Sequence, residues 1–548
     1  MERRPRPPRR AVAPSFLSAL LLLAIVAVAA WLRFTRISWG LDDGAFFFDE
    51  TFYTSRAIAF VPLSWSSFDL NDFTYPTLYG YLGGLATLAG TALGLVPRQL
   101  ATDTPVLLLL LRALSAAISV ATVLLVAILG RRMYSARVGL AAAALMAVVP
   151  LHAMHAHIAA PDSVLTACTV VVLLACFDLA RRGTAVSSAG AGIAAGLSFT
   201  AKYTGLASFA PVLWGALEAA VRRGSLRVFV LMVVSALGAG AATVGLVCSP
   251  CALRWREMLA SMNYLHAAST FLASDYLNHH LVPTLGWYGR PYLYQLVAAL
   301  PFSLGWPLYV LALLGALHAA WRCELADRVL LAGLLPYFAV IGRSQLVFPR
   351  YLMPLFPPLV LLAARVACGS DERGRTGSAV LLAVFVYSLA LTTSQVTRFS
   401  TDQQRSVARW ITEQVPHAAG GPALRVGVAD LSGGLGYDQL EKPLTRAGLI
   451  YSPLDDGHWF DGQPDVFVMP EWKEISVRRD RPDSVAARQL RELESGAAGY
   501  RLGARFRSTY LQSDLYTRLD PAFASDLWQG EIGFSVYVPA SARSGAPG

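Results

Sequence analysis

The sequence predicts a polytopic α-helical membrane protein of about eleven transmembrane helices, with a C-terminal extracytoplasmic domain of α/β or α+β type. Of its 548 residues, 55% are hydrophobic and 15% are charged, whereas soluble proteins carry about 25% charged residues. Long apolar runs alternate with short basic clusters as far as residue 396, as expected for membrane spans joined by cytoplasmic loops. Residues 397–548 have the polarity of a soluble domain.

The first predicted span, residues 14–31, follows the arginine-rich start MERRPRPPRR. Arginine and lysine collect on the cytoplasmic side of spans, so we expect a cytoplasmic N-terminus. A cleaved signal peptide is the alternative, because Ala27 and Ala29 resemble a cleavage site. The length of the run and the many later spans favour an uncleaved helix.

The later spans define the topology. Every second loop between them is basic, beginning with Arg131 and Arg132, so those loops are predicted to be cytoplasmic. The loops also account for the net charge of +10 without nucleic acid. If residues 76–96 crossed as well, the pattern would invert, so we expect a helix or re-entrant segment at the outer interface. The spans are predicted at residues 105–130, 137–151, 163–180, 189–201, 204–220, 226–248, 293–318, 328–342, 351–367 and 377–395.

Because the N-terminus is predicted to be cytoplasmic and the number of spans is odd, we expect the C-terminus on the outer side of the membrane. The predicted domains are therefore a membrane domain, residues 1–396, whose first outer loop covers 37–104, and an extracytoplasmic domain, residues 397–548. Within the latter, DQQRSVARWITEQV has the spacing of an amphipathic helix. We expect strands over ALRVGVAD, DVFVMP and IGFSVYVP. This domain could contact an acceptor or cover the outer face.

Six cysteines are scattered along the chain, and only Cys248 and Cys251 are close in sequence. We place both at the outer membrane surface, where a disulfide is chemically allowed. Two isolated small cysteines are the preferred interpretation.

Two acidic sites fall on the outer side. Asp49 and Glu50 lie in FFFDETFY, and Asp162 opens a span in HIAAPDSV. Aromatic neighbours would exclude water from Asp49 and Glu50. This desolvation would raise a carboxylate's pKa toward the range that suits a general base. A solvated turn is the alternative there. Asp162 could instead serve only as a cap in the first turn of its helix.

Cationic residues fall on the same side. Lys202 interrupts an apolar stretch in GLSFTAKYTGL, which is costly unless its amine reaches the interface or an anion. Arg350 in VFPRYLMP, and more weakly Arg290 in WYGRPYLY, could bind phosphate. Arg350 could otherwise anchor to lipid headgroups. Arg112 is expected to reach outward from the second span.

Together these residues suit a phosphate leaving group and a hydroxyl or amine nucleophile. A lipid-linked phosphosugar supplies that chemistry, and the chain has no Gly-rich nucleotide-binding motif. His152, His155 and His157 have spacing that metal ligands can use, but such histidines more often lie hydrated among headgroups. We predict no metal ligand and no certain cofactor, and a divalent metal stays compatible with the acidic residues.

Seven motifs in order resemble the C-type membrane glycosyltransferases, in the branch of protein O-mannosyltransferases and lipid A aminoarabinose transferases. The resemblance covers about residues 15–396. The motifs are FDETFY, YPTLYGYL, GRRMYSARVGL, APDSVLTACTVVVLLA, GLSFTAKYTGL, RPYLYQLVAALPFSLGWPL and PRYLMPLFPPLVLLAA.

The resemblance implies inverting transfer from a polyprenyl-phosphate sugar in a bacterial inner membrane, with juxtamembrane helices in the first outer loop. It implies that Asp49 is the catalytic base, with Glu50 beside it. Asp162 matches an acidic position, and Lys202 and Arg350 match cationic positions near the carrier phosphate. Relatives often have His-Pro-Pro-Leu-Tyr where this chain has YPTLY, which leaves the acceptor side open. The predicted substrate-binding residues are Tyr53, Tyr75, Tyr79 and His157.

Two other functions fit the same pattern. A transporter or lipid-sugar flippase also has many spans and intramembrane charges, but the chain shows no paired half-repeats. An inactive membrane scaffold is the third hypothesis. The sequence defines neither the sugar nor the acceptor, which could be lipid, glycan or protein.

Overall fold

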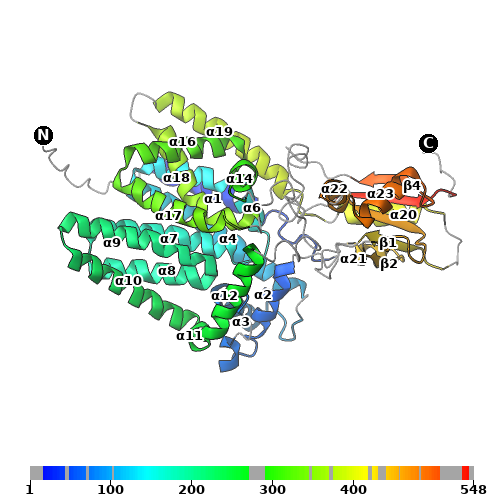
Figure 1. Cartoon of the computed structure of the whole chain (residues 1–548), viewed down its shortest axis with the longest axis horizontal. Helices are drawn as coiled ribbons and strands as arrows, with labels where there is room; N and C mark the ends of the chain where they lie inside the picture. Colours follow the sequence, from blue (N-terminus) through cyan, green and yellow to red (C-terminus); the bar gives the residue numbers. More distant parts are fainter. Residues whose placement is uncertain are drawn as a thin grey trace.

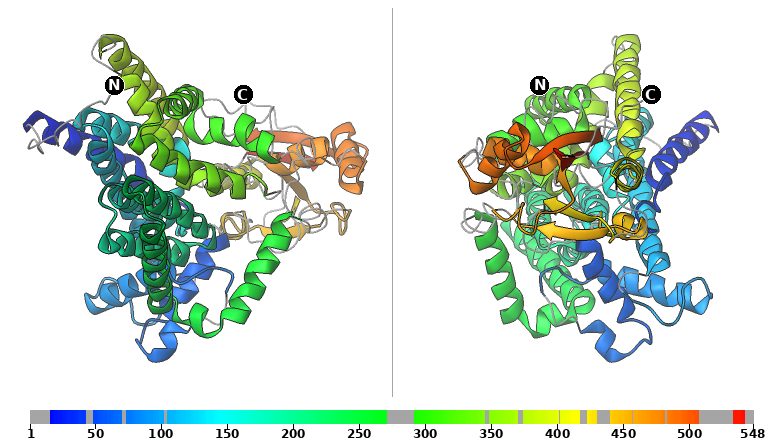
Figure 2. Two further views of the ribbon diagram at one scale, coloured as in Figure 1. Left: turned by 60° about the vertical axis from the view of Figure 1, so that its left-hand side comes forward. Right: turned by 90° about the vertical axis from the view of Figure 1, so that its right-hand side faces the viewer.

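The computed structural model has a helical body with a smaller sheet domain at one end (Figure 1). In the left view of Figure 2 the sheet domain again lies beside the helical body, and in the right view it lies in front of it. The described residues are 16–42, 48–69, 73–101, 104–270, 291–344, 348–369, 374–400, 402–416, 422–429, 440–455, 457–480, 483–506 and 533–541.

The body is built from helices that are mostly apolar along their whole length. Their bounds are α1 Phe16–Phe34, α2 Phe48–Ile58, α3 Leu78–Ala92, α4 Pro105–Met133, α5 Ala136–Ala147, α6 Pro150–His155, α7 Asp162–Arg182, α8 Ala185–Ala201, α9 Phe209–Arg223, α10 Leu226–Val247, α11 Ser249–Leu253, α12 Trp255–Thr270, α14 Pro291–Tyr294, α15 Leu300–Leu304, α16 Trp306–Arg322, α17 Leu325–Ile341, α18 Phe356–Cys368 and α19 Gly374–Val396. Short 3₁₀ turns η1 (Trp65–Phe68), η2 (Tyr203–Ser208) and η6 (Pro349–Leu355), and the π-helical turn η5 (Gln295–Ala299), complete it.

Within the described ranges, seven helices are long and apolar enough to cross a membrane: α1, α4, α7, η2 with α9, α10, η6 with α18, and α19. The predicted continuous span at 293–318 is wrong in shape. It is two segments, Pro291–Leu304 and Trp306–Arg322, bent by 119°. Gly305 permits the break because its φ of +79° suits a residue without a side chain. The total of eleven spans stays a prediction.

The segment excluded from the span count forms α3, which has 15 residues. A helix of that length reaches about 22 Å, short of the roughly 30 Å of a bilayer core. It packs against α2 in the stretch between α1 and α4. The length of α3 therefore suits the predicted helix at the outer interface.

Helices α8 and α10 pack closely because α8 carries glycine where they meet. A Cβ built on Gly192 would lie 2.0 Å from the carbonyl oxygen of Ala236, and one on Gly196 would lie 2.8 Å from that of Gly240. Small residues allow such close backbone approach between membrane helices.

Gly192→Ala is therefore expected to lower stability by about 1–3 kcal/mol, because α8 and α10 must separate. Gly190→Ala is the matched control on the same helix, since nothing lies within 4 Å of its added Cβ. The measurement is the thermal unfolding midpoint of both variants in detergent. Equal midpoints would contradict the close packing.

At the C-terminal end of α10, a disulfide joins Cys248 and Cys251, so the preference for two isolated cysteines is wrong. Cys248 lies between α10 and the short helix α11, and Cys251 lies within α11. The two Cα atoms are thereby 5.2 Å apart, within the range that a disulfide bridges.

The sheet domain has the strand order β2-β1-β3-β5-β4. Strands β2, β1 and β3 are parallel, and β5 and β4 continue the sheet in antiparallel pairs. Parallel strands and covering helices make the domain α/β in character. The bounds are α20 Asp402–Gln414, β1 Arg425–Ala429, α21 Glu441–Arg446, β2 Ile450–Leu454, β3 Val466–Pro470, α22 Glu471–Asp480, α23 Val485–Ser495, β4 Tyr500–Phe506 and β5 Phe534–Pro539.

Both faces of this sheet are covered by helices. Val466 and Val468 of β3 pack in one apolar cluster with Val407 of α20. The alternate residue Phe467 packs in a second cluster with Leu490 of α23. This alternation places α20 and α23 on opposite faces, as the side-chain period of a strand requires. The predicted amphipathic helix and the three predicted strands are all present, as α20, β1, β3 and β5.

Candidate active site

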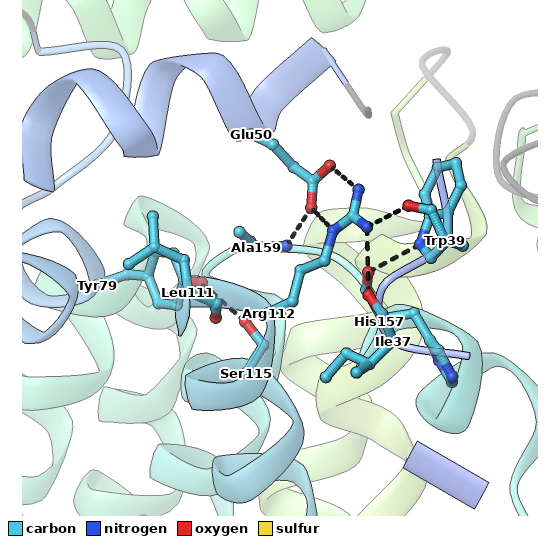
Figure 3. A network of polar contacts seen from close by, with 9 residues as sticks. All are labelled: Ile37, Trp39, Glu50, Tyr79, Leu111, Arg112, Ser115, His157 and Ala159. Carbon is cyan, nitrogen blue, oxygen red and sulfur yellow. Dashed lines mark hydrogen bonds and ion pairs between the residues drawn. The ribbon is translucent and has the colours of Figure 1, made fainter. Parts of the chain in front are cut away.

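The first candidate group begins at α2. Asp49 is the second residue of this helix, and its side chain lies outside the described part of the chain. Glu50 follows and is fully buried. Its two carboxylate oxygens accept hydrogen bonds from Nε and Nη2 of Arg112, both at 2.8 Å, and one oxygen also accepts from the backbone N–H of Ala159 at 2.9 Å (Figure 3).

Arg112 of α4 is buried, whereas the sequence suggested that it reaches outward. Its Nη1 donates to the carbonyl oxygens of Trp39 at 2.6 Å and Ile37 at 3.2 Å, and its guanidinium lies 4.5 Å from the centre of a Trp39 ring. A buried ion pair is stable only when such further hydrogen bonds satisfy both partners. This geometry suits Glu50 for holding α2 against α4.

The second candidate group centres on Asp162 and Lys202. Asp162 is the first residue of α7, as the sequence predicted, and Lys202 lies between α8 and η2. The Lys202 Nζ donates to Oδ1 of Asp162 at 2.8 Å, and both side chains are nearly buried. These two residues are 40 positions apart and come from two different helices. A charged pair inside the membrane domain is costly to bury, so its residues are candidates for a functional role.

Arg350 lies next to this pair. It belongs to η6 and is 6% exposed. Its guanidinium lies 5.7 Å from the ring centre of Tyr351, and the Lys202 amine lies 4.5 Å from the same ring. Arg350 also interacts electrostatically with Asp162. The structure thus brings Asp162, Lys202 and Arg350 together, as the sequence predicted for a phosphate site.

One apolar cluster joins the two groups. It contains Tyr53 of α2, Val164 and Leu165 of α7, and Ala201, the neighbour of Lys202. Ala159, whose N–H binds Glu50, is in the same cluster. The helix that bears Asp49 therefore packs on the elements that carry Asp162 and Lys202.

The predicted aromatic residues form one group beside α2. The Tyr53 ring centre lies 4.8 Å from that of Tyr79 and 5.7 Å from that of Tyr75. The Tyr79 hydroxyl donates to the Leu111 carbonyl oxygen at 3.1 Å and lies 2.8 Å from the Ser115 hydroxyl. Tyr79 of α3 is thus hydrogen-bonded to α4. Substrate contact by these three tyrosines stays a prediction.

His152 and His157 have different partners. His152 Nδ1 accepts from Arg33 at 2.9 Å, whereas His157 faces the carbonyl oxygens of Thr35 and Ala153. Burial lowers the pKa of His157 to about 4, although those carbonyl oxygens favour the charged ring. Both ring nitrogens of His157 lie within hydrogen-bond distance of a carbonyl oxygen. It lies in the Arg112 network and not beside Lys202, and no group of three metal-binding side chains occurs within the described ranges.

Arg290 lies outside the described residues. Sequence reasoning missed Tyr351, which contacts both cationic residues, and the partnership of Arg112 with Glu50. The signals were present, since PRYLMP places an aromatic residue beside Arg350 and the second span contains one arginine among leucines. Neither motif identifies its partner.

The arrangement defines a polytopic membrane protein with a buried cluster of charged side chains. Its fold is that of the C-type glycosyltransferases. The oligosaccharyltransferase AglB of Archaeoglobus fulgidus, in complex with an inhibitory peptide and a dolichol-phosphate, is similar with a TM-score of 0.50 and 13% identity. That match covers 93% of this chain and 77% of AglB.

Sequence comparison agrees over part of the chain. Residues 107–248, from α4 to the end of α10, match the family of dolichyl-phosphate-mannose-protein mannosyltransferases. The predicted resemblance is thereby confirmed. No curated protein matches the chain in sequence.

Two further structures have lower TM-scores. The apo form of the A. fulgidus oligosaccharyltransferase matches at 0.49 with 14% identity, over 80% of this chain and 64% of its own length. ArnT from Cupriavidus metallidurans, bound to undecaprenyl phosphate, matches with a TM-score of 0.44 and 13% identity. That match covers 85% of this chain and 95% of ArnT. This chain therefore spans less than two thirds of the apo oligosaccharyltransferase.

Proposed function

We propose that the chain is a glycosyltransferase that moves a sugar from a polyprenyl-phosphate carrier to an extracytoplasmic acceptor. The observation that carries the proposal is the buried Asp162–Lys202 pair with Arg350 beside it. The AglB structure of the same fold contains a dolichol-phosphate, and the matching family takes its name from a dolichyl-phosphate sugar. Both support a lipid phosphate as the ligand of these residues.

Lys202 is suited to this role because its ammonium group has three donors. Within the described residues one of them is bonded to Asp162. The remaining donors can bind phosphate oxygens, while Asp162 holds the amine in place. Arg350 adds a second positive charge near the leaving group, and such charges stabilise a departing phosphate.

The proposed reaction is a single displacement. An acceptor oxygen or nitrogen attacks the anomeric carbon, and the bond from that carbon to the phosphate oxygen breaks with inversion. The acceptor proton passes to Asp49, and the carrier leaves as polyprenyl phosphate. Glu50 holds the start of α2 through Arg112 and so positions Asp49.

The position of the basic residues supports an outward-facing site. Asp162 opens the 21-residue helix α7, and Arg181 and Arg182 close it about 30 Å away. Arg131 and Arg132 likewise lie at the far end of α4 from Arg112. Basic ends mark the cytoplasmic face. We therefore place the site and the sheet domain outside the plasma membrane of a bacterium.

The test uses the full chain in proteoliposomes with undecaprenyl-phosphate-linked sugars and an envelope extract as acceptor. The expected result is release of undecaprenyl phosphate together with sugar appearing on an acceptor. Transfer of intact lipid-sugar between leaflets, without release of the carrier, would establish a flippase instead. Mass analysis of envelope glycans from a deletion strain would then identify the acceptor.

A further inference from the structure

The turn after α1 supports the Glu50–Arg112 pair from the other side. Residues 35–42 form this turn, and the carbonyl oxygens of Ile37 and Trp39 accept from Arg112. The Trp39 indole N–H donates to the His157 carbonyl oxygen at 3.2 Å, and His157 Nε2 lies 2.8 Å from the Thr35 carbonyl oxygen. Trp39 and His157 therefore fix the two chain segments that hold Glu50 and Arg112 (Figure 3).

Phe399 packs against both of these residues. Its ring is stacked on His157, with centres 4.5 Å apart and an angle of 6° between planes, and lies 5.3 Å from Trp39. Phe399 is 2% exposed. It lies three residues after the end of α19 and three before the start of α20. The junction of the two domains is thus buried in the network that holds Glu50.

Among the described residues, three further contacts between the sheet domain and this turn involve exposed side chains. Arg36 lies 3.8 Å from Asp402, and Arg405 lies 3.9 Å from Asp42. Arg446 of α21 donates to the carbonyl oxygen of Asp42. Exposed ion pairs hold weakly. Phe399, in contrast, makes a buried contact with this turn.

We propose that Phe399 is a positioning residue, which couples the sheet domain to the helix that carries Asp49. The path runs from the Phe399 ring to Trp39 and His157, then through Arg112 to Glu50, the neighbour of Asp49. Each step is a direct contact between buried groups. A shift of the domain junction would therefore move Trp39 and His157, release Arg112, and loosen the start of α2. The effect on sugar transfer rests on the proposed function, but the coupling itself does not.

The structural test is amide hydrogen exchange of the full chain in detergent. Phe399→Leu keeps an apolar side chain but removes the stacked ring. Exchange in residues 48–58 is expected to rise at least about tenfold, because opening of α2 becomes easier. Phe399→Tyr keeps the ring and is expected to retain the protection. Phe385→Leu, the same change on α19 at a partly buried site packed against the main core, is the control and should leave exchange in residues 48–58 unchanged.

The kinetic test compares the same variants in the transfer assay. Phe399→Leu is expected to lower kcat about ten- to a hundredfold with little change in KM for the lipid-linked sugar, because misplaced catalytic groups slow chemistry more than binding. A double variant with Glu50→Gln should lose little beyond the larger single effect, since both act on one path.

Unchanged exchange in residues 48–58 in Phe399→Leu would overturn the coupling, whatever the activity. An equal rise in Phe385→Leu would also overturn it, because the effect would then be general loosening. If the wild-type chain transfers no sugar, the proposed function fails while the exchange result still decides the coupling.

Discussion

Replacing Asp49 with asparagine is expected to lower the rate of sugar transfer by about 10²–10⁴-fold, the usual contribution of a general base. Asparagine has nearly the same size and cannot accept the acceptor proton. The Glu50–Arg112 pair beside it remains, so α2 keeps its anchor. The loss should therefore appear in kcat, with KM for the lipid-linked sugar almost unchanged. The measurement is steady-state transfer by the purified variant in proteoliposomes.

Asp69→Asn is the matched control. Asp69 lies in the same outer loop, and its carboxylate makes an exposed ion pair with Arg254 at 2.7 Å. The same chemical change there should leave turnover within about twofold, since exposed pairs contribute little. Thermal unfolding of both variants checks that the fold is intact. Turnover of Asp49→Asn above about a tenth of the wild-type rate would remove Asp49 from the role of base.

The helical elements could be predicted because a membrane permits few backbone structures. Every backbone group in lipid needs an internal partner, so an apolar run long enough to cross becomes a helix. The bend at Gly305 could not be predicted, because glycine and proline are common inside transmembrane helices and the run itself stays apolar. The disulfide was missed for a different reason. Residues three apart lie close together in any helical turn, so the spacing permits a disulfide without requiring one, and the structure shows that this pair is bonded.

Part of the site could be predicted from the free-energy cost of placing a charged side chain in an apolar segment. Lys202 and Arg350 stood out because an isolated cation in an apolar run is expensive. That argument identifies a residue without identifying its partner. Asp162 and Lys202 are 40 positions apart, and Glu50 and Arg112 are 62 apart. Their pairing depends on how α7 and α8, or α2 and α4, pack. Phe399 gave no signal, because a phenylalanine after a span is an ordinary residue.

Replacing Lys202 with methionine has the second large expected effect, and it changes both stability and binding. The Asp162 carboxylate would lose the ammonium group 2.8 Å away while staying buried. Removing one partner of a buried pair costs about 3–5 kcal/mol. A single variant that fails to bind the carrier could therefore simply be misfolded, and an activity assay alone would not separate the two causes.

The double variant Asp162→Asn with Lys202→Met separates them. It removes both charges, and replacing a whole buried pair with neutral groups is often close to neutral for stability. Its unfolding midpoint should recover towards that of the wild type. Its affinity for undecaprenyl phosphate in nanodiscs should remain about 10- to 100-fold weaker, because charge-assisted hydrogen bonds to the phosphate are still missing. Wild-type affinity in a stable double variant would mean that Lys202 serves only to neutralise Asp162, and the carrier phosphate would then have to be held elsewhere.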